Sequence, residues 1–367
     1  MSGDVIFVIV VAAALVFDFT NGFHDTANVV ATAISTRAIA PRPAILLASL
    51  LNFVGAFISL KVAATVATGF VDIQAVTMPV LFAGLVGAIA WNLATWYLGL
   101  PSSSSHALIG GLVGAVLASS GSSAVSGSAL FSNLIVPAIV APVLAFTVAG
   151  TAIWLIYRIV GHLRPGPVNR GFRLGQLASS GLLSLSHGTN DAQKTMGVIA
   201  LALVAHGDIS ASNFHVPSWV VVVSASAIAL GTLSGGWRII RTLGSGIIKM
   251  DPPQGFASQG AGAAVILAAS SAGYPLSTTH VVSGAITGAG AAKRFSAVRW
   301  GVAGNIVMAW IVTVPAAGLF GALVYDLSGM FGAGVTGPLV ISGALLALLA
   351  LALVRRAHQT VPAPAAS

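Results

Sequence analysis

The 367-residue chain contains no cysteine, and charged residues make up only 7% of it. Without cysteine it can form neither a disulfide framework nor a thiolate metal site. Glutamate is absent as well, so that all eight acidic residues are aspartates. A soluble domain typically carries about 25% charged residues, whereas this chain is 56% hydrophobic. The composition excludes a soluble fold of this size and predicts an all-α polytopic membrane protein.

Apolar runs recur along the whole chain, each close to the roughly 20 residues that cross a bilayer as a helix. The alternating patterns of a membrane β-barrel are absent. The first apolar run has no basic segment before it, so we expect it to be retained as a helix rather than cleaved as a signal peptide. The expected elements are 4–20 with 26–36, 43–60, 78–98, 106–119 and 132–157, followed by 174–187 with 192–205, 217–235, 259–273, 280–291, 300–325 and 333–354.

The net charge of +8 is distributed unevenly between the connecting segments. If the N-terminus lies outside and chain direction alternates, fourteen basic residues fall on one side, Lys61 falls on the other, and Lys194 lies at membrane depth. This asymmetry follows the positive-inside rule. It predicts a multi-pass protein of the cytoplasmic (inner) membrane with its basic loops in the cytoplasm, and it argues against a nucleic-acid-binding protein.

Two short motifs each occur twice, in the same order. NGFHDTAN (Asn21–Asn28) resembles HGTNDAQK (His187–Lys194) at an offset of 166 residues. LPSSSSHALIGGLVG (Leu100–Gly114) resembles YPLSTTHVVSGAITG (Tyr274–Gly288) at an offset of 174 residues. Two separate motifs at nearly one offset indicate a duplicated unit.

Each unit contains five apolar elements, so the second unit enters the membrane from the opposite face. This predicts two inverted-topology repeats, an arrangement common among secondary transporters. Gly22 and Gly188 are expected to break their helices. The hairpins 78–98 with 106–119 and 259–273 with 280–291 either span the membrane or turn back within it, so the fold is expected to have broken helices or re-entrant hairpins that meet at the midplane. The predicted organisation is a first inverted repeat (1–160), a basic cytoplasmic linker (161–173), a second inverted repeat (174–325), and an additional C-terminal transmembrane helix with a short tail (326–367).

The duplicated hydroxyl runs are candidate anion ligands. Each run follows a proline, and Ser, Thr and Asn are favoured helix N-cap residues, so a new helix is expected to begin there. A helix N-terminus presents free N–H groups and the positive end of its dipole, which together favour an anion. The alternative is that the hydroxyls only support close helix packing or satisfy backbone at a kink. The candidate ligands are Ser103, Ser104, Ser105, Ser277, Thr278 and Thr279.

Three aspartates lie within apolar stretches: Asp18, Asp25 and Asp191. An ionised carboxylate there costs roughly 3 kcal/mol or more and is by default a functional hypothesis. The nearby amides Asn28 and Asn190 add hard oxygen ligands of the kind that suits a cation.

Two basic side chains accompany these acids. His24 precedes Asp25 directly, and a carboxylate beside an imidazole suits a proton relay. Lys194 lies three residues after Asp191, within ion-pair reach on a helix. It is either a simple counter-ion or an anion contact and proton-linked switch. Since carboxylates repel an anion, they must be protonated or hold a cation, which predicts coupled transport.

These motifs resemble those of the Pit/PiT family of inorganic phosphate transporters. The resemblance covers residues 5–325 and rests on NGFHDTANVVAT, WNLATWYLGLPSSSSHALIG, SHGTNDAQK and PLSTTH. It implies inorganic phosphate as substrate, cation symport and a homodimer. By position, Asp25, Asn28 and Asp191 belong to the coupling and phosphate region, and the six hydroxyl residues contact phosphate.

The chain departs from the sodium-coupled pattern of this family at His24, where asparagine is usual, and at Lys194, where an asparagine would repeat Asn28. Both departures look like the bacterial low-affinity branch, which moves phosphate with protons, often as a metal–phosphate complex. We therefore expect proton symport of phosphate, with sodium symport as the alternative. A divalent metal held by Asp25 and Asp191 remains open, and no resident cofactor is expected.

Other classes of protein are weaker readings of the same residues. Ser and His adjoin in SSSSH and STTH, as in a hydrolase, but neighbours on one helical turn do not form a Ser-His-Asp geometry. Buried cation-binding carboxylates argue against an anion channel, because they do not fit a passive path for anions. A sulfate transporter would use the same donors, although sulfate, unlike phosphate, has no proton to share with an acceptor such as Asp25 at neutral pH.

Overall fold

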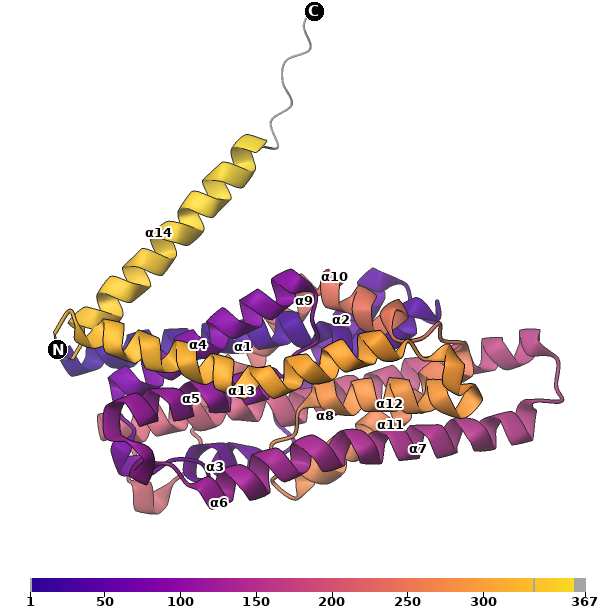
Figure 1. Ribbon diagram of the computed structural model, residues 1–367, viewed down its shortest axis with the longest axis horizontal. Coiled ribbons are helices and arrows are strands. Elements are labelled where there is room, and N and C mark those ends of the chain that lie inside the picture. The colour runs from indigo at the N-terminus through magenta and orange to yellow at the C-terminus, as the bar shows by residue number, and fades with distance from the viewer. Residues whose placement is uncertain (1, 333, 360–367) are drawn as a thin grey trace, which may run out of the picture.

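The computed structural model describes residues 2–332 and 334–359, and most of them are helical (Figure 1). A π-helical turn, Phe131–Ile135, joins α6 (Gly127–Leu130) to α7 (Val136–Val160), and another, Thr242–Gly246, extends α10 (Trp237–Arg241). The helices of the first half are α1 (Ser2–Ser35), α2 (Pro41–Gly55), α3 (Lys61–Thr68), α4 (Met78–Leu98), α5 (Ser104–Ser120), α6 (Gly127–Leu130) and α7 (Val136–Val160). Those of the second are α8 (Pro165–His206), α9 (Ser218–Ser234), α10 (Trp237–Arg241), α11 (Pro252–Ser271), α12 (Thr278–Lys293), α13 (Trp300–Gly329) and α14 (Thr336–Gln359).

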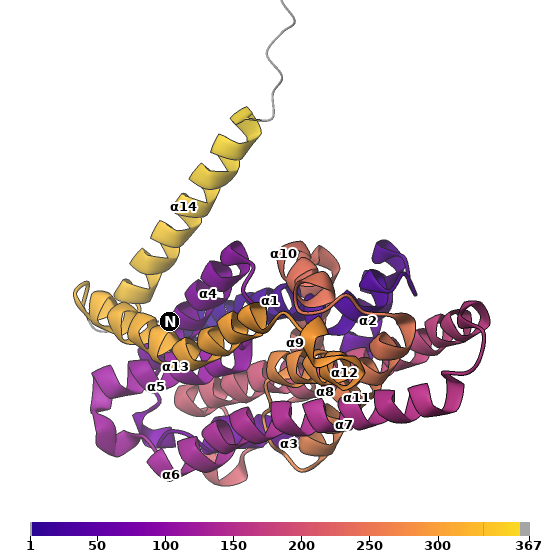
Figure 2. The ribbon, with the colours of Figure 1, turned by 45° about the vertical axis from the view of Figure 1, so that its right-hand side comes forward.

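The predicted all-α membrane architecture is confirmed. Four helices are long and apolar enough to cross a bilayer: Gly3–Ser35, Met78–Leu98, Gly127–Val160 and Trp300–Gly329. A fifth candidate is the pair Ser218–Ser234 and Trp237–Gly246, bent by 62°. The expected extra C-terminal helix is α14, which projects away from the bundle in Figures 1 and 2. The last residues of the predicted tail, 360–367, lie outside the described residues.

The prediction that α1 and α8 break at Gly22 and Gly188 is wrong. Both are continuous, with 34 residues in α1 and 42 in α8, and the latter already includes most of the basic segment 161–173. The two glycines instead allow close approach of a neighbouring helix. A methyl group at Gly22 would collide with the backbone of Ile228 in α9, and one at Gly188 with the backbone of Asn52 in α2. Without a hydrophobic drive between helices in lipid, small residues are the means of tight packing.

The duplicated hydroxyl runs form the same local structure in both halves. α4 ends at Gly99 and α11 is followed by Gly273, both in the left-handed conformation that glycine adopts readily (φ 67° and 83°). Two residues later a proline prevents either helix from continuing. Ser103 then caps α5 by accepting from the His106 N–H (3.1 Å), and Ser277 caps α12 by accepting from the His280 N–H (3.3 Å). The predicted N-caps are therefore confirmed.

The halves are intertwined in space. Gly110 and Gly114 of α5 lie directly against the backbone of α13, which belongs to the other half. Their counterparts Gly284 and Gly288 of α12 lie in the same way against α7 of the first half. Each short helix with a hydroxyl tip is thus held by the last long helix of the opposite half.

The direction of the two long central helices agrees with an inverted duplication. In Figure 1, α1 leads from the N-terminus at the left towards α2 at the right, whereas α8 begins at the right, after α7, and runs back to the left. The central part of α8, residues 186–203, is completely buried. Because other helices surround it, α8 can carry polar residues that a lipid-facing helix could not.

Candidate functional site

The tips of α5 and α12 face each other at the centre of the bundle, as the sequence predicts. The Ser105 hydroxyl lies 3.4 Å from the main-chain carbonyl of Leu276, just before the opposite tip. One turn into each helix, the rings of His106 and His280 meet edge to face, with centroids 4.6 Å apart. Two helix N-termini therefore converge on one small region, between the middle parts of α1 and α8.

Asp25 of α1 lies between the two tips and accepts from both. Its Oδ2 lies 3.1 Å from the Ser104 hydroxyl of α5 and 3.2 Å from the Thr278 hydroxyl of α12. Its Oδ1 lies 2.7 Å from His24 Nδ1 and 3.5 Å from the Thr279 hydroxyl. Three of the six hydroxyls that the sequence assigns to an anion thus face a carboxylate in this conformation, and the Ser104 hydroxyl also lies 2.6 Å from Asn21 Oδ1.

Asp191 of α8 occupies the corresponding place on the other side. Its Oδ1 forms an ion pair with Lys194 Nζ (2.5 Å), and its Oδ2 lies 3.4 Å from the Thr278 hydroxyl. That hydroxyl is therefore within reach of both carboxylates, although its single proton can serve only one at a time. Asp25 and Asp191 thus belong to one cluster.

His187 of α8 joins the two carboxylates, with its Nε2 3.2 Å from Asp191 Oδ2 and 3.9 Å from Asp25 Oδ2. Its other nitrogen, Nδ1, lies 3.2 Å from Asn52 Oδ1. The Asn52 amide nitrogen donates to the Thr232 hydroxyl (2.9 Å), which in turn donates to a main-chain carbonyl of its own helix. These hydrogen bonds orient Asn52 Oδ1 towards the His187 ring. Because Oδ1 can only accept, His187 Nδ1 carries a proton. A bare lone pair on Nε2 would face two carboxylates, so Nε2 needs a proton or a metal ion.

Sequence analysis did not include His187 among the site residues. The signal was present, because an offset of 166 residues aligns His187 with Asn21 and His24 with Asn190. Each motif therefore holds one histidine and one asparagine at exchanged positions. What could not be read from the sequence is that the second histidine reaches across to the aspartate of the other half.

The aligned residues Asn28 and Lys194 make equivalent contacts. The Asn28 amide nitrogen donates to the Thr279 hydroxyl (2.9 Å) on the tip of α12. Lys194 donates to the Ser105 hydroxyl, the aligned position on the tip of α5, and to the main-chain carbonyl of Leu276 (2.8 Å). Each long helix thereby holds the hydroxyl tip of one short helix.

Other predicted site residues lie further from this cluster. Ser103 and Ser277 are occupied as helix caps. The Asn190 amide nitrogen donates to Ser270 of α11 (2.8 Å), away from the carboxylates. Asp18 is completely buried, and neither of its oxygens has a hydrogen-bond partner in the described part of the chain. Their roles in binding or coupling stay predictions.

The cluster is suited to a cation as well as to an anion. Asp25, His187 and Asp191 each offer one ligand atom, and these atoms lie within 4.8 Å of one another, all buried. One imidazole with two carboxylates is a ligand set that first-row transition metals accept. The predicted metal ligands Asp25 and Asp191 are therefore joined by a third that was not predicted.

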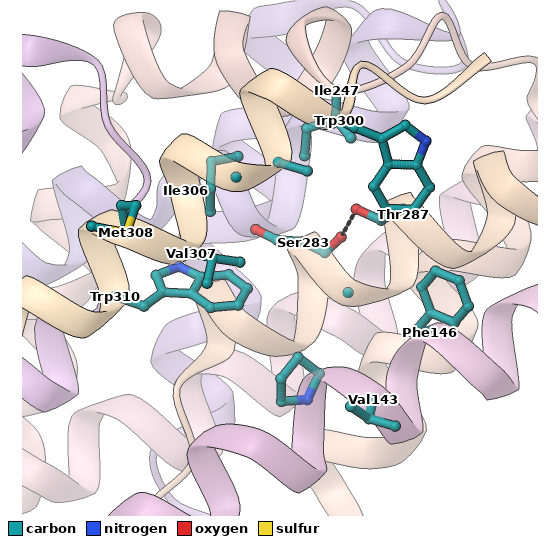
Figure 3. A pocket seen from close by; sticks show the side chains of 14 residues that line it. Val143, Phe146, Ile247, Ser283, Thr287, Trp300, Ile306, Val307, Met308 and Trp310 are labelled. Carbon is teal, nitrogen blue, oxygen red and sulfur yellow. Dashed lines mark hydrogen bonds between the residues drawn. The ribbon is translucent and has the colours of Figure 1, made fainter. Parts of the chain in front are cut away.

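Large cavities lie away from this cluster of Asp25, His187 and Asp191, on the flank of the bundle. One of about 670 Å³ lies between α7, α12 and α13, among Phe146, Trp300 and Trp310 (Figure 3). Its few polar groups are uncharged: the Thr287 hydroxyl donates to the Ser283 carbonyl (2.7 Å), and the Ser283 hydroxyl has no hydrogen-bond partner among the described residues. No charged side chain lines this cavity, which makes it unsuited to an inorganic ion.

Comparison with known proteins identifies a single family. Residues 21–166 and 162–321 match the "Phosphate transporter family". The "Probable low-affinity inorganic phosphate transporter" of Mycobacterium bovis is 52% identical over 96% of this chain and 84% of its own length. The protein of the same description from Bacillus subtilis is 42% identical over 88% of this chain and 97% of its own. A solved structure described as "The sodium-dependent phosphate transporter" superposes with a TM-score of 0.75 at 25% identity, covering 88% of this chain and 98% of that one.

Proposed function

Because the chain belongs to the phosphate transporter family, we propose that it imports inorganic phosphate across the cytoplasmic membrane by proton symport. The family consists of transporters, so the hydrolase reading of the Ser-His motifs is excluded. The observation that carries the proton assignment is the position of His187. Its Nε2 faces Asp25 and Asp191, while Asn52 orients the ring through Nδ1.

The charge of the buried groups supports coupling to a cation. Asp25 and Asp191 provide two carboxylates and Lys194 provides one ammonium, all less than 3% exposed. Before a proton or metal ion reaches His187 Nε2, these three groups carry one net negative charge. At low effective dielectric this repulsion would exclude an anion. Phosphate binding therefore requires that positive charge enter with it.

The hydroxyl contacts suggest how the two binding events depend on each other. The hydroxyls of Thr278 and Thr279 now face Asp25, and the Ser104 hydroxyl lies within reach of Asp25 Oδ2 (3.1 Å) and Asn21 Oδ1 (2.6 Å). A carboxylate neutralised by a proton or a metal ion no longer requires these charge-assisted hydrogen bonds. The released hydroxyls, with the free N–H groups of two helix N-termini, can then bind phosphate oxygens. Cation uptake would thus assemble the phosphate site.

Transport would follow from movement of the interlocked halves around this site. The tips of α5 and α12 are held by α13 and α7 of the opposite halves, so a rocking motion would move both tips together. Inverted repeats with a central site commonly give access from each face in turn. The cytoplasmic position of the basic loops and a homodimeric assembly remain predictions.

Phosphate uptake into proteoliposomes tests the proposal. We expect an inward proton gradient alone to drive uptake of labelled phosphate, and a protonophore to abolish it, because the coupling ion is a proton. An inward sodium gradient at constant pH should not replace it. Uptake driven only by sodium would contradict proton symport but leave the substrate assignment intact. If neither gradient drives uptake, even with magnesium supplied, phosphate itself is the wrong substrate.

Sodium symport is the second candidate, and the name of the solved relative favours it. Against it stands Lys194, which contributes fixed positive charge where its counterpart Asn28 contributes none. Sulfate is the remaining alternative substrate. We expect excess unlabelled sulfate to leave phosphate uptake unchanged, because sulfate cannot donate a proton to a carboxylate at neutral pH.

Replacing His187 by glutamine separates coupling from phosphate binding. Glutamine can keep a hydrogen bond to Asn52 but cannot carry a proton between Asp25 and Asp191. We expect proton-driven uptake to fall by about tenfold or more, the scale of one lost charge-assisted contact. Exchange of internal for external phosphate without a gradient should fall less. Equal loss of both activities in a folded variant would mean that His187 is merely structural.

A further inference from the structure

We propose that the Lys194 ammonium is a tethered cation, which permanently fills a position that a free monovalent cation would otherwise occupy. The proposal rests on the phosphate symport described above and concerns its cation requirement. It assigns the α8 side of the site a coupling charge that belongs to the protein itself. Only the α1 side would then need a cation from solution.

The surroundings of the ammonium are those of a cation site. Lys194 Nζ contacts a carboxylate oxygen of Asp191 (2.5 Å), the main-chain carbonyl of Leu276 (2.8 Å) and the hydroxyl of Ser105. These are three kinds of hard oxygen ligand. They come from α8, from the start of α5 and from the segment just before α12. The side chain is 1% exposed, whereas lysine is almost never fully buried unless it is paired. The oxygen cage is thus a built site, and the ammonium is its occupant.

The other half shows the same place without a tethered charge. Asn28, aligned with Lys194, donates a neutral amide to Thr279, which is aligned with Ser105. Asp25, aligned with Asp191, has no lysine beside it, and its neighbours are His24 and His187. A duplicated site therefore carries a fixed cation on one side only. This asymmetry predicts that a neutral residue at position 194 restores the need for a free cation there.

The decisive variant is Lys194→Asn, which places at position 194 the same residue as its counterpart Asn28. It leaves Asp191 without a fixed counter-charge and leaves the oxygens of Ser105 and Leu276 available as ligands. Lys194→Met is the matched control, because it removes the same charge but supplies no oxygen. Sodium and lithium are the probe ions, and choline is the inert replacement.

Phosphate uptake is measured at a constant inward proton gradient with the same alkali ion on both sides, so that this ion activates without driving. We expect sodium to raise uptake by Lys194→Asn about tenfold over choline, the scale of one regained counter-charge contact. Wild type and Lys194→Met should respond less than twofold. A Lys194→Asn variant that transports as well in choline as in sodium would overturn the proposal, because the position would then need no cation.

Binding of radioactive sodium to the detergent-purified proteins tests, independently of transport, whether a free cation occupies the site when Lys194 is replaced. We expect saturable binding by Lys194→Asn, and weaker binding by both wild type and Lys194→Met. Equal binding by all three proteins, or none by Lys194→Asn, would also overturn the proposal. If wild type takes up no phosphate under any gradient, the proposed function fails, while the binding measurement still decides the role of Lys194.

Discussion

Replacement of Asp25 or Asp191 by asparagine is expected to reduce proton-driven phosphate uptake to roughly 1% of wild type or less. Each carboxylate receives hydroxyls from the helix tips and contacts His187, so an amide would remove both the cation ligand and the partner of that ring. Removing one member of a buried charged pair costs about 3–5 kcal/mol, which corresponds to more than a hundredfold. The measurement is the initial rate of uptake in proteoliposomes with equal amounts of protein.

Stability measurements distinguish a lost site from a lost fold. Asp191→Asn leaves Lys194 buried without its carboxylate, so the melting temperature of the purified protein should fall. Adding Lys194→Met removes the orphaned charge and should recover most of the loss without restoring uptake. Asp208→Asn is the control, because that side chain is 49% exposed and lies outside the cluster. Wild-type uptake by folded Asp25→Asn or Asp191→Asn would sink the assignment of coupling to these residues.

Enlarging Gly22 or Gly188 is expected to cost more stability than any surface change in the protein. A methyl group at either position would meet the backbone of the neighbouring helix, which cannot turn aside as a side chain can. Overpacking costs about 1–3 kcal/mol for small insertions and more where backbone must move. Gly22→Ala and Gly188→Ala should therefore lower the melting temperature, and valine at either position should prevent recovery of monodisperse protein.

The matched control is Gly304→Ala, in the second turn of α13, where an added methyl group has nothing within 4 Å. Its melting temperature should equal or slightly exceed that of wild type, since alanine favours a helix over glycine. Size-exclusion chromatography after graded heating gives the comparison. If Gly22→Ala and Gly304→Ala melt alike, α1 and α9 do not pack as closely as the structure has them.

The sequence alone determined the class of protein and much of its local structure. Its apolar composition indicated a membrane protein, and its long apolar runs without alternation indicated helices, in which the backbone groups form their hydrogen bonds within each segment. The duplicated motifs marked the residues that meet at the centre, and the N-caps Ser103 and Ser277 followed from short-range chemistry. These features depend on residues close together in the chain, or on a repeat visible within it. They could therefore be predicted without a structure.

Only the tertiary structure decided how the two halves are joined. The sequence predicts helix breaks at Gly22 and Gly188, yet each glycine instead allows a helix of the opposite half to pack closely. No local sequence pattern distinguishes a glycine that breaks a helix from one that permits close packing. His187 has one partner nearby in sequence, Asp191, but its partners Asp25 and Asn52 are distant in sequence, and only these connect it to the other half. The pairing of Lys194 with Ser105 and Leu276 has the same origin. The sequence determines which charged and polar side chains are available, whereas long-range packing determines which of them contact one another.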